Sequence, residues 1–138
     1  MRLDSMMTAV HVSALVVWIG SMLSAYVAAR VASVDDATRQ VIALRIYNWL
    51  ARPAFIVTLV FGALRLGMDW RHYLVTTHFM HTKLTLAFVA IVAHHFLGAR
   101  IRSSSTAQAF RSPATTAAVA IFALSCLAAV IVIVVRPM

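Results

Sequence analysis

Four long apolar runs, nearly free of charged residues, constrain this chain more than any other feature of its sequence. They cover about residues 5–29, 49–66, 79–99 and 113–135. A helix needs about 20 apolar residues to cross the hydrocarbon core of a bilayer. Hydrophobic residues make up 62% of the 138 positions and charged residues only 12%, whereas soluble domains carry about 25% charged residues. We therefore predict an all-α integral membrane protein, a four-transmembrane-helix bundle that forms one transmembrane domain over residues 1–138.

The segments between the runs are polar and short. The stretch that holds Asp35, Asp36, Arg39 and Arg45 is expected to be a connector that is partly helical at the membrane interface. Residues 67–72 are expected to form a turn-rich loop. Proline is favoured in the first turn of a helix because its missing N–H would have no partner there. We accordingly expect the second helix to run from about Trp49, with Arg52-Pro53 near its start, and the fourth to start near Ser112-Pro113.

The positive charge of the chain is better explained by the membrane than by nucleic acid. The formal net charge is +8, and the basic residues lie almost entirely between the apolar runs. They serve there as topology signals and as anchors for anionic headgroups. Seven arginines border the connectors at residues 30–52 and 100–111, against four on the other side. We expect both connectors in the cytoplasm and both termini outside, in a multi-pass protein with no nucleic-acid partner.

Ionisable residues inside the apolar runs are the strongest indication of function. Such a side chain near the centre of a bilayer costs at least about 2.5–3.5 kcal/mol, so it usually faces the bundle interior. The candidates are His11 in the first run and, in the third, His81, Lys83, His94 and His95. Lys83 is the only lysine and has two interpretations. It is either a snorkelling interfacial residue or a positive charge or proton donor that faces the bundle.

Helical geometry divides the residues of the third run between two faces. Lys83 and His94 are eleven residues apart, which places them about 20° apart around the axis and about 16 Å apart along it. His81 and His95 share a nearly opposite face. His11, His81 and Lys83 belong to one leaflet, so a small ligand would use His11 with His81 or Lys83. Only a large ligand such as haem, which commonly takes neutral imidazole as its axial ligand, would span from His11 to His94.

Trp18 and the sulfur-containing residues add less. Trp18 follows His11 by seven residues on the same helical face, and it is interpreted either as helix packing or as a wall of a porphyrin pocket. The single Cys126 excludes an internal disulfide and lies in the last run, as a small hydrophobe would. The seven methionines are scattered rather than regularly spaced, so the sequence supports a copper relay only weakly.

Several short motifs occur in a fixed order along the chain. The first helix contains Val10-His11…Trp18-Ile19-Gly20, the second Arg52-Pro53-Ala54…Thr58…Phe61-Gly62, the third His81-Thr82-Lys83-Leu84…His94, and the chain ends Val135-Arg136-Pro137-Met138. In this order and spacing the chain resembles the HemJ-type protoporphyrinogen IX oxidases, small four-helix membrane proteins related to CopD-like copper-resistance proteins. The likeness covers nearly the whole chain, and it implies a place in the bacterial cytoplasmic (inner) membrane.

The resemblance implies a haem b-containing oxidoreductase that converts protoporphyrinogen IX to protoporphyrin IX. Six electrons and six protons leave the porphyrinogen substrate, and a quinone or another respiratory component is the expected electron acceptor. The alternative is a non-catalytic haem-binding electron carrier or a CopD-like metal-handling protein. Four short helices have little interior space for a haem and a second tetrapyrrole, so we expect a homo-oligomer.

The same resemblance implies roles for individual residues. His11 and Lys83 are expected to be catalytic, with Lys83 assisting proton transfer or holding a substrate propionate. His11 is expected to bind the haem iron, with His81 or His94 as the second metal ligand. Trp18 and Arg52 are expected to line the cofactor site, with Arg52 next to a propionate.

Overall fold

The computed structural model describes residues 3–31, 33–68, 70–76, 78–103 and 107–134, and these form helices joined by short turns, with no strand among them. Four helical stretches are long and apolar enough to cross a membrane: Ser5–Ala28, Asp36–Met68, Phe79–Ser103 and Pro113–Val132. The prediction of an all-α protein with four membrane-spanning helices is therefore confirmed. The helices are α1 (Leu3–Ala28), α2 (Asp36–Ile46), α3 (Arg52–Met68), α4 (His78–Ser103), the short α5 (Ala107–Phe110) and α6 (Pro113–Val134).

The second spanning helix is longer than the sequence predicted. The polar stretch expected to be a connector is α2, and it continues without a break through the π-helix η1 (Tyr47–Ala51) into α3. Asp35 begins α2 as its N-cap, because its Oδ1 accepts a hydrogen bond from the Thr38 backbone N–H at 2.9 Å. Asp35 therefore fixes the start of the long helix, upstream of the start that the sequence predicted.

Pro53 lies within the long second helix, far from its start at Asp36, and not near the start as expected. It directly follows the π turn, in which the Arg52 N–H bonds to the carbonyl of Tyr47. A proline inside an α-helix loses one hydrogen bond and its ring presses on the carbonyl four residues back. A π turn shifts that bonding register by one residue and widens the backbone. The π turn therefore lets the helix pass through Pro53 where a regular α-helix would break.

The other helix boundaries lie close to those expected, with two differences. The loop expected at residues 67–72 is partly helical: α3 runs to Met68, and a second π-helix, η2 (His72–Thr76), precedes α4. At its other end α4 extends to Ser103, four residues beyond the expected end, and carries Arg100 and Arg102 in its last turn. Cations at the end of a helix are favourable because they face its negative dipole end.

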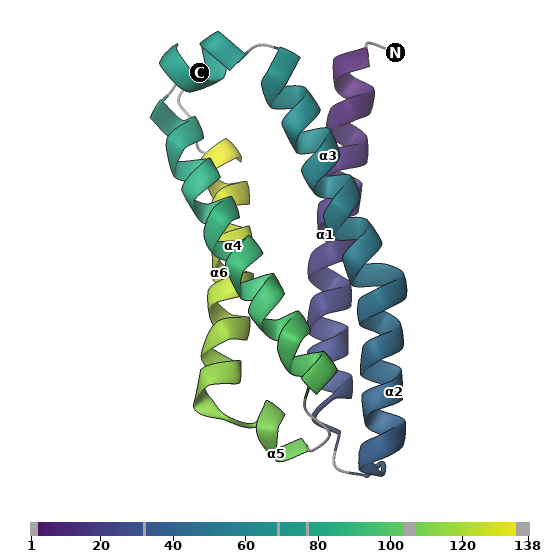
Figure 1. Cartoon of the computed structure of the whole chain (residues 1–138). Coiled ribbons are helices and arrows are strands. Elements are labelled where there is room, and N and C mark those ends of the chain that lie inside the picture. The colour runs from purple at the N-terminus through teal and green to yellow at the C-terminus, as the bar shows by residue number, and fades with distance from the viewer. Residues whose placement is uncertain (1–2, 32, 69, 77, 104–106, 135–138) are drawn as a thin grey trace.

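The helices form two closely packed antiparallel pairs. Helix α1 packs along α3, and α4 packs along α6, while the pairs meet mainly through α1 with α6 and α2 with α4. Figure 1 shows the pairs approaching each other toward the end where α2 begins and α5 lies, and separating toward the end where α1 begins and α6 ends. We call these the connector end and the termini end.

The core lies between the pairs, in the half nearer the connector end. Trp18 of α1 contacts the rings of Phe55 on α3 and Phe122 on α6, with ring centroids 5.1 and 5.2 Å apart. Tyr47 in η1 is only 2% exposed and packs against Gly98 of α4. A Cβ on Gly98 would lie 2.2 Å from the Tyr47 hydroxyl, so only glycine permits this approach of helix and ring.

Candidate functional site

His11 is held against α3 by one hydrogen bond that determines which ring nitrogen is free. Its Nδ1 lies 2.9 Å from the backbone carbonyl oxygen of Thr58. A carbonyl can only accept, so Nδ1 carries the proton and donates it. Nε2 of the neutral ring therefore keeps its lone pair. A histidine that binds a metal commonly has this arrangement, with the second nitrogen donating to a carbonyl.

Gly62 makes the space that His11 occupies. An added Cβ at this glycine would lie 3.0 Å from Cε1 and 3.2 Å from Nδ1 of the imidazole, but 4.0 Å from Nε2. Of these three ring atoms, Nε2 lies farthest from Gly62. The Thr58 hydroxyl is turned back to the Ala54 carbonyl at 2.8 Å, so the backbone of Thr58 is what binds the histidine. Thr58 and Gly62, four residues apart, form the seat of His11 on α3.

Lys83 lies across from this seat on the other helix pair. Its side chain is half-buried, and it interacts electrostatically with His11 on α1 and with Arg65 on α3. Arg65 is seven residues, about two helical turns, beyond Thr58 toward the termini end. The structure therefore brings together His11 and Lys83, as the sequence predicted for one leaflet, and adds Arg65 as a second cation beside Lys83.

His94 belongs to the core and not to the neighbourhood of His11. It is 1% exposed, and its Nδ1 accepts a hydrogen bond from Trp18 Nε1 at 3.0 Å. The ring is stacked on Phe55 at 4.5 Å and on Tyr47 at 5.5 Å, with 27° between planes in both cases. Because Nδ1 accepts, Nε2 of the neutral ring carries the proton. Neither nitrogen then has a lone pair for a metal, so His94 as placed does not fit an axial ligand.

His81 and His95 are both exposed, which agrees with the helical geometry that set them opposite Lys83 and His94. His81 Nε2 lies 2.9 Å from the Leu74 carbonyl oxygen in η2. Its proton is therefore on Nε2, and the ring ties η2 to the start of α4. Among the residues that the structure describes, no three His, Cys, Asp or Glu side chains converge as metal ligands.

Trp18 and Arg52, expected beside the cofactor, lie in the half that contains His94. Trp18 is 4% exposed and its one donor is used by His94, as the packing interpretation requires. Arg52 is exposed, at the point where η1 becomes α3, and it interacts electrostatically with His94. The Phe55 and Tyr47 rings around His94 were not foreseen, because nothing local to either residue indicates a histidine 39 or more positions away.

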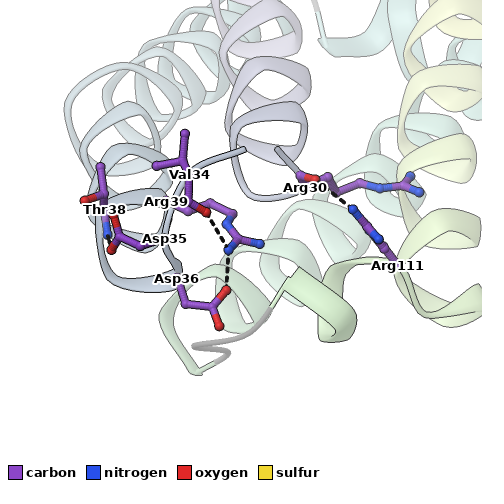
Figure 2. Close-up of polar contacts among 7 residues, drawn as sticks. All are labelled: Arg30, Val34, Asp35, Asp36, Thr38, Arg39 and Arg111. Atoms are coloured by element: carbon purple, nitrogen blue, oxygen red, sulfur yellow. Dashed lines mark hydrogen bonds and ion pairs between the residues drawn. The ribbon is translucent and has the colours of Figure 1, made fainter. Parts of the chain in front are cut away.

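At the connector end, Figure 2 shows two separate sets of polar contacts, one around Arg39 and one between Arg111 and Arg30. Arg39 of α2 is 6% exposed, and its Nη2 donates to the Val34 carbonyl and to Asp36. Its Nε and Nη1 have no hydrogen-bond partner among the described residues. Arg111 donates weakly to the Arg30 carbonyl at 3.5 Å. The Arg39 contacts are local to the start of α2, whereas the Arg111 contact joins the residues that follow α1 to those that precede α6.

The chemistry of the described residues thus separates into two parts. The His11, Lys83 and Arg65 side chains offer one free imidazole lone pair beside two cations in the half nearer the termini end. The His94 cluster offers packing and an internal hydrogen bond. No protein-family model, curated protein or solved structure matches this chain.

Proposed function

We propose that the protein is a haem b-containing membrane oxidase that converts protoporphyrinogen IX to protoporphyrin IX, the activity implied by its resemblance to the HemJ-type oxidases. The observation that supports this proposal is the way in which the backbone of Thr58 holds the His11 ring. Its Nδ1–H is committed to the Thr58 carbonyl at 2.9 Å, which leaves Nε2 available as a ligand. An imidazole held in this tautomer fits an axial ligand of haem iron.

In this proposal His11 binds the iron and His94 does not, because both of its nitrogens are unavailable. A bound haem would supply one-electron transfer, for which the side chains of this protein have no counterpart. His81 could reach a metal only through Nδ1, since Nε2 donates to the Leu74 carbonyl. The second axial ligand then comes from another chain of a homo-oligomer, from a small molecule, or from His81 after it leaves Leu74.

Lys83 and Arg65 are proposed to hold the carboxylates of the substrate. A porphyrinogen carries two propionates, and the two cations lie within electrostatic range of each other on opposite helix pairs. A carboxylate between them would relieve their repulsion and bring the macrocycle next to His11. Arg52 lies six residues, about 9 Å, from Thr58 toward the connector end. Its predicted contact with a propionate therefore requires a ligand that extends from His11 to Arg52.

The electrons are proposed to pass to a quinone or another respiratory component, and the six protons to leave through groups near Lys83. The distribution of arginines supports a connector end in the cytoplasm and both termini outside, in the bacterial inner membrane. The substrate site next to His11 would then lie in the outer leaflet. Cysteine labelling from each side of the membrane, at Ser5 and at Ser103, tests this orientation.

The haem is tested by the absorption spectrum of the purified protein. The wild type is expected to show a Soret band, and His11→Ala is expected to lose it while keeping its helical circular dichroism. His95→Ala, at an exposed position on α4, is the matched control and is expected to keep the band. A folded wild type with no Soret band, or a His11→Ala variant that keeps it in full, would refute the proposed ligand.

The reaction is tested by complementation of a strain that lacks its protoporphyrinogen oxidase. Wild type is expected to restore growth and Lys83→Met to fail. A haem-loaded protein that is reduced by quinol but inert to protoporphyrinogen would instead be an electron carrier. Stoichiometric copper without porphyrin would favour metal handling and refute the oxidase.

A further inference from the structure

An apolar groove runs along the outward face of the α4–α6 pair. It has a volume of about 440 Å³, and every residue that lines it is apolar. Mostly large side chains of α4 form one wall and mostly alanines of α6 form the other, so a chain-like ligand would fit between them. The wall residues include Phe88, Val92 and Phe96 of α4 and Ala114, Ala118 and Ile121 of α6.

The groove extends from mid-helix to the connector end. Phe88 and Phe96 are eight residues apart, which is about 12 Å along α4. Helix α6 runs antiparallel and begins at Pro113, so Ala114 marks the same end of the groove. Phe88 is 66% exposed and Phe96 39% exposed, so both residues remain open to the surrounding lipid.

Positive charge lies at the connector end of the groove. The Arg100 guanidinium lies over the ring of Phe96, 5.5 Å from its centroid, one helical turn beyond the groove wall. The N-terminus of α6 lies at the same end and adds the positive pole of a 22-residue helix. In the first turn of α6 Pro113 has no N–H and the Thr115 N–H donates to Ser112 Oγ, so this end attracts a phosphate through the helix dipole rather than through free N–H groups.

We propose that this groove binds an anionic phospholipid from the leaflet at the connector end, with an acyl chain along the groove and the phosphate at Arg100. The apolar walls favour a hydrocarbon chain, and the positive charge at one end orients the lipid with its headgroup at that end. Stacking on Phe96 uses the face of the Arg100 guanidinium, so its N–H groups can still donate hydrogen bonds to phosphate oxygens. A second copy of this chain is disfavoured as the occupant, because it would bring its own Arg100 against a groove whose lining residues include no acidic side chain.

The proposal is tested with the full-length protein in mixed vesicles or in detergent. Native mass spectrometry would compare the binding of phosphatidylglycerol with that of phosphatidylcholine carrying the same acyl chains. Wild type is expected to prefer phosphatidylglycerol about fivefold, as one basic residue near an anionic headgroup provides. Arg100→Gln is expected to remove this preference while it leaves acyl-chain binding in place. Arg71→Gln is the matched control, because Arg71 also stacks on an aromatic ring, that of Trp70, at 5.7 Å.

A second variant tests the groove itself. Ala117→Phe fills it and is expected to weaken both lipids severalfold, whereas Ala120→Phe, exposed on the same helix but outside the groove wall, is expected to leave both unchanged. If Ala117→Phe does not fold, the comparison of Arg100→Gln with Arg71→Gln decides alone. Equal binding of the two lipids by wild type, co-purification of an isoprenoid tail in place of phospholipid, or conversion of a dimer to a monomer by Ala117→Phe would overturn the proposal.

Discussion

Substitution of Gly98 by alanine is the sharpest test of how the two helix pairs are joined. The added methyl would lie 2.2 Å from the hydroxyl oxygen of Tyr47, 2.5 Å from Cζ and 2.9 Å from Cε2. Carbon atoms in contact are normally about 3.5–4.0 Å apart, so the ring would have to move by an ångström or more. Tyr47 is 2% exposed and belongs to the π turn within the long helix, so it cannot move freely.

Forcing an extra methyl into a packed core typically costs about 1–3 kcal/mol. We expect Gly98→Ala to reach the upper part of this range, since it displaces a whole ring that also stacks on His94. The assay is reversible unfolding in mixed detergent and SDS, followed by circular dichroism, from which the free energy of unfolding is obtained. Gly20→Ala is the control, because a Cβ at Gly20 would meet no atom within 4 Å.

A double variant separates this clash from any other effect of the alanine. Tyr47→Leu removes the hydroxyl and shortens the side chain, so it should recover part of the stability lost in Gly98→Ala even though it destabilises the wild type. The two effects would then be strongly non-additive, as expected for residues in contact. A Gly98→Ala variant within about 0.5 kcal/mol of wild type, or strictly additive effects, would refute the close packing of Tyr47 on α4.

Three further substitutions test other parts of the structure by the same unfolding assay. Trp18→Phe should cost about 1–2 kcal/mol, because Nδ1 of His94 stays buried without its hydrogen-bond donor. Trp70→Phe, at an exposed position, should be neutral. Equal costs of the two substitutions would contradict the hydrogen bond between Trp18 and His94. Arg39→Met should lower the free energy of unfolding by less than about 1 kcal/mol or raise it. Two guanidinium nitrogens of Arg39 have no hydrogen-bond partner among the described residues, and apolar replacements of buried ion pairs are often neutral or stabilising. A loss above about 2 kcal/mol would show that these nitrogens have an acceptor. The backbone hydrogen bond at the start of α2 lowers the pKa of Asp35 from its ordinary 3.8, so its carboxylate stabilises the helix above that pH and the contribution is lost as pH falls through the lowered pKa. Asp35→Asn should keep the cap and remove this pH dependence, whereas a variant that still shows it would contradict the assignment.

The fold could be predicted largely from local sequence because the membrane imposes a simple requirement. Every backbone polar group must be satisfied inside the bilayer, so long apolar runs become helices whatever they pack against. The second span departed from the prediction where two local signals competed. The charges of Asp36 and Arg39 suggested a connector and Pro53 suggested a helix start, but an N-cap and a π turn let one helix run through both.

The candidate site was predicted in part, through side chains that are costly to place in a bilayer. His11 and Lys83 stood out for that reason, and the structure brings them into electrostatic range. His94 stood out for the same reason, yet it is stacked in the core. Burial cost identifies residues that need a partner, but it does not distinguish a ligand from a satisfied core histidine.

The sequence by itself determined that the chain forms four membrane-spanning helices and which few polar side chains they bury, because both follow from the hydrophobicity of consecutive residues. Only the tertiary structure decided which nitrogen of each histidine is free. That choice depends on the Thr58 carbonyl for His11 and on the Trp18 indole for His94, groups that are 47 and 76 residues away along the chain. One donor and one acceptor, each supplied by another helix, thus separate two similar histidines into a candidate ligand and a structural residue.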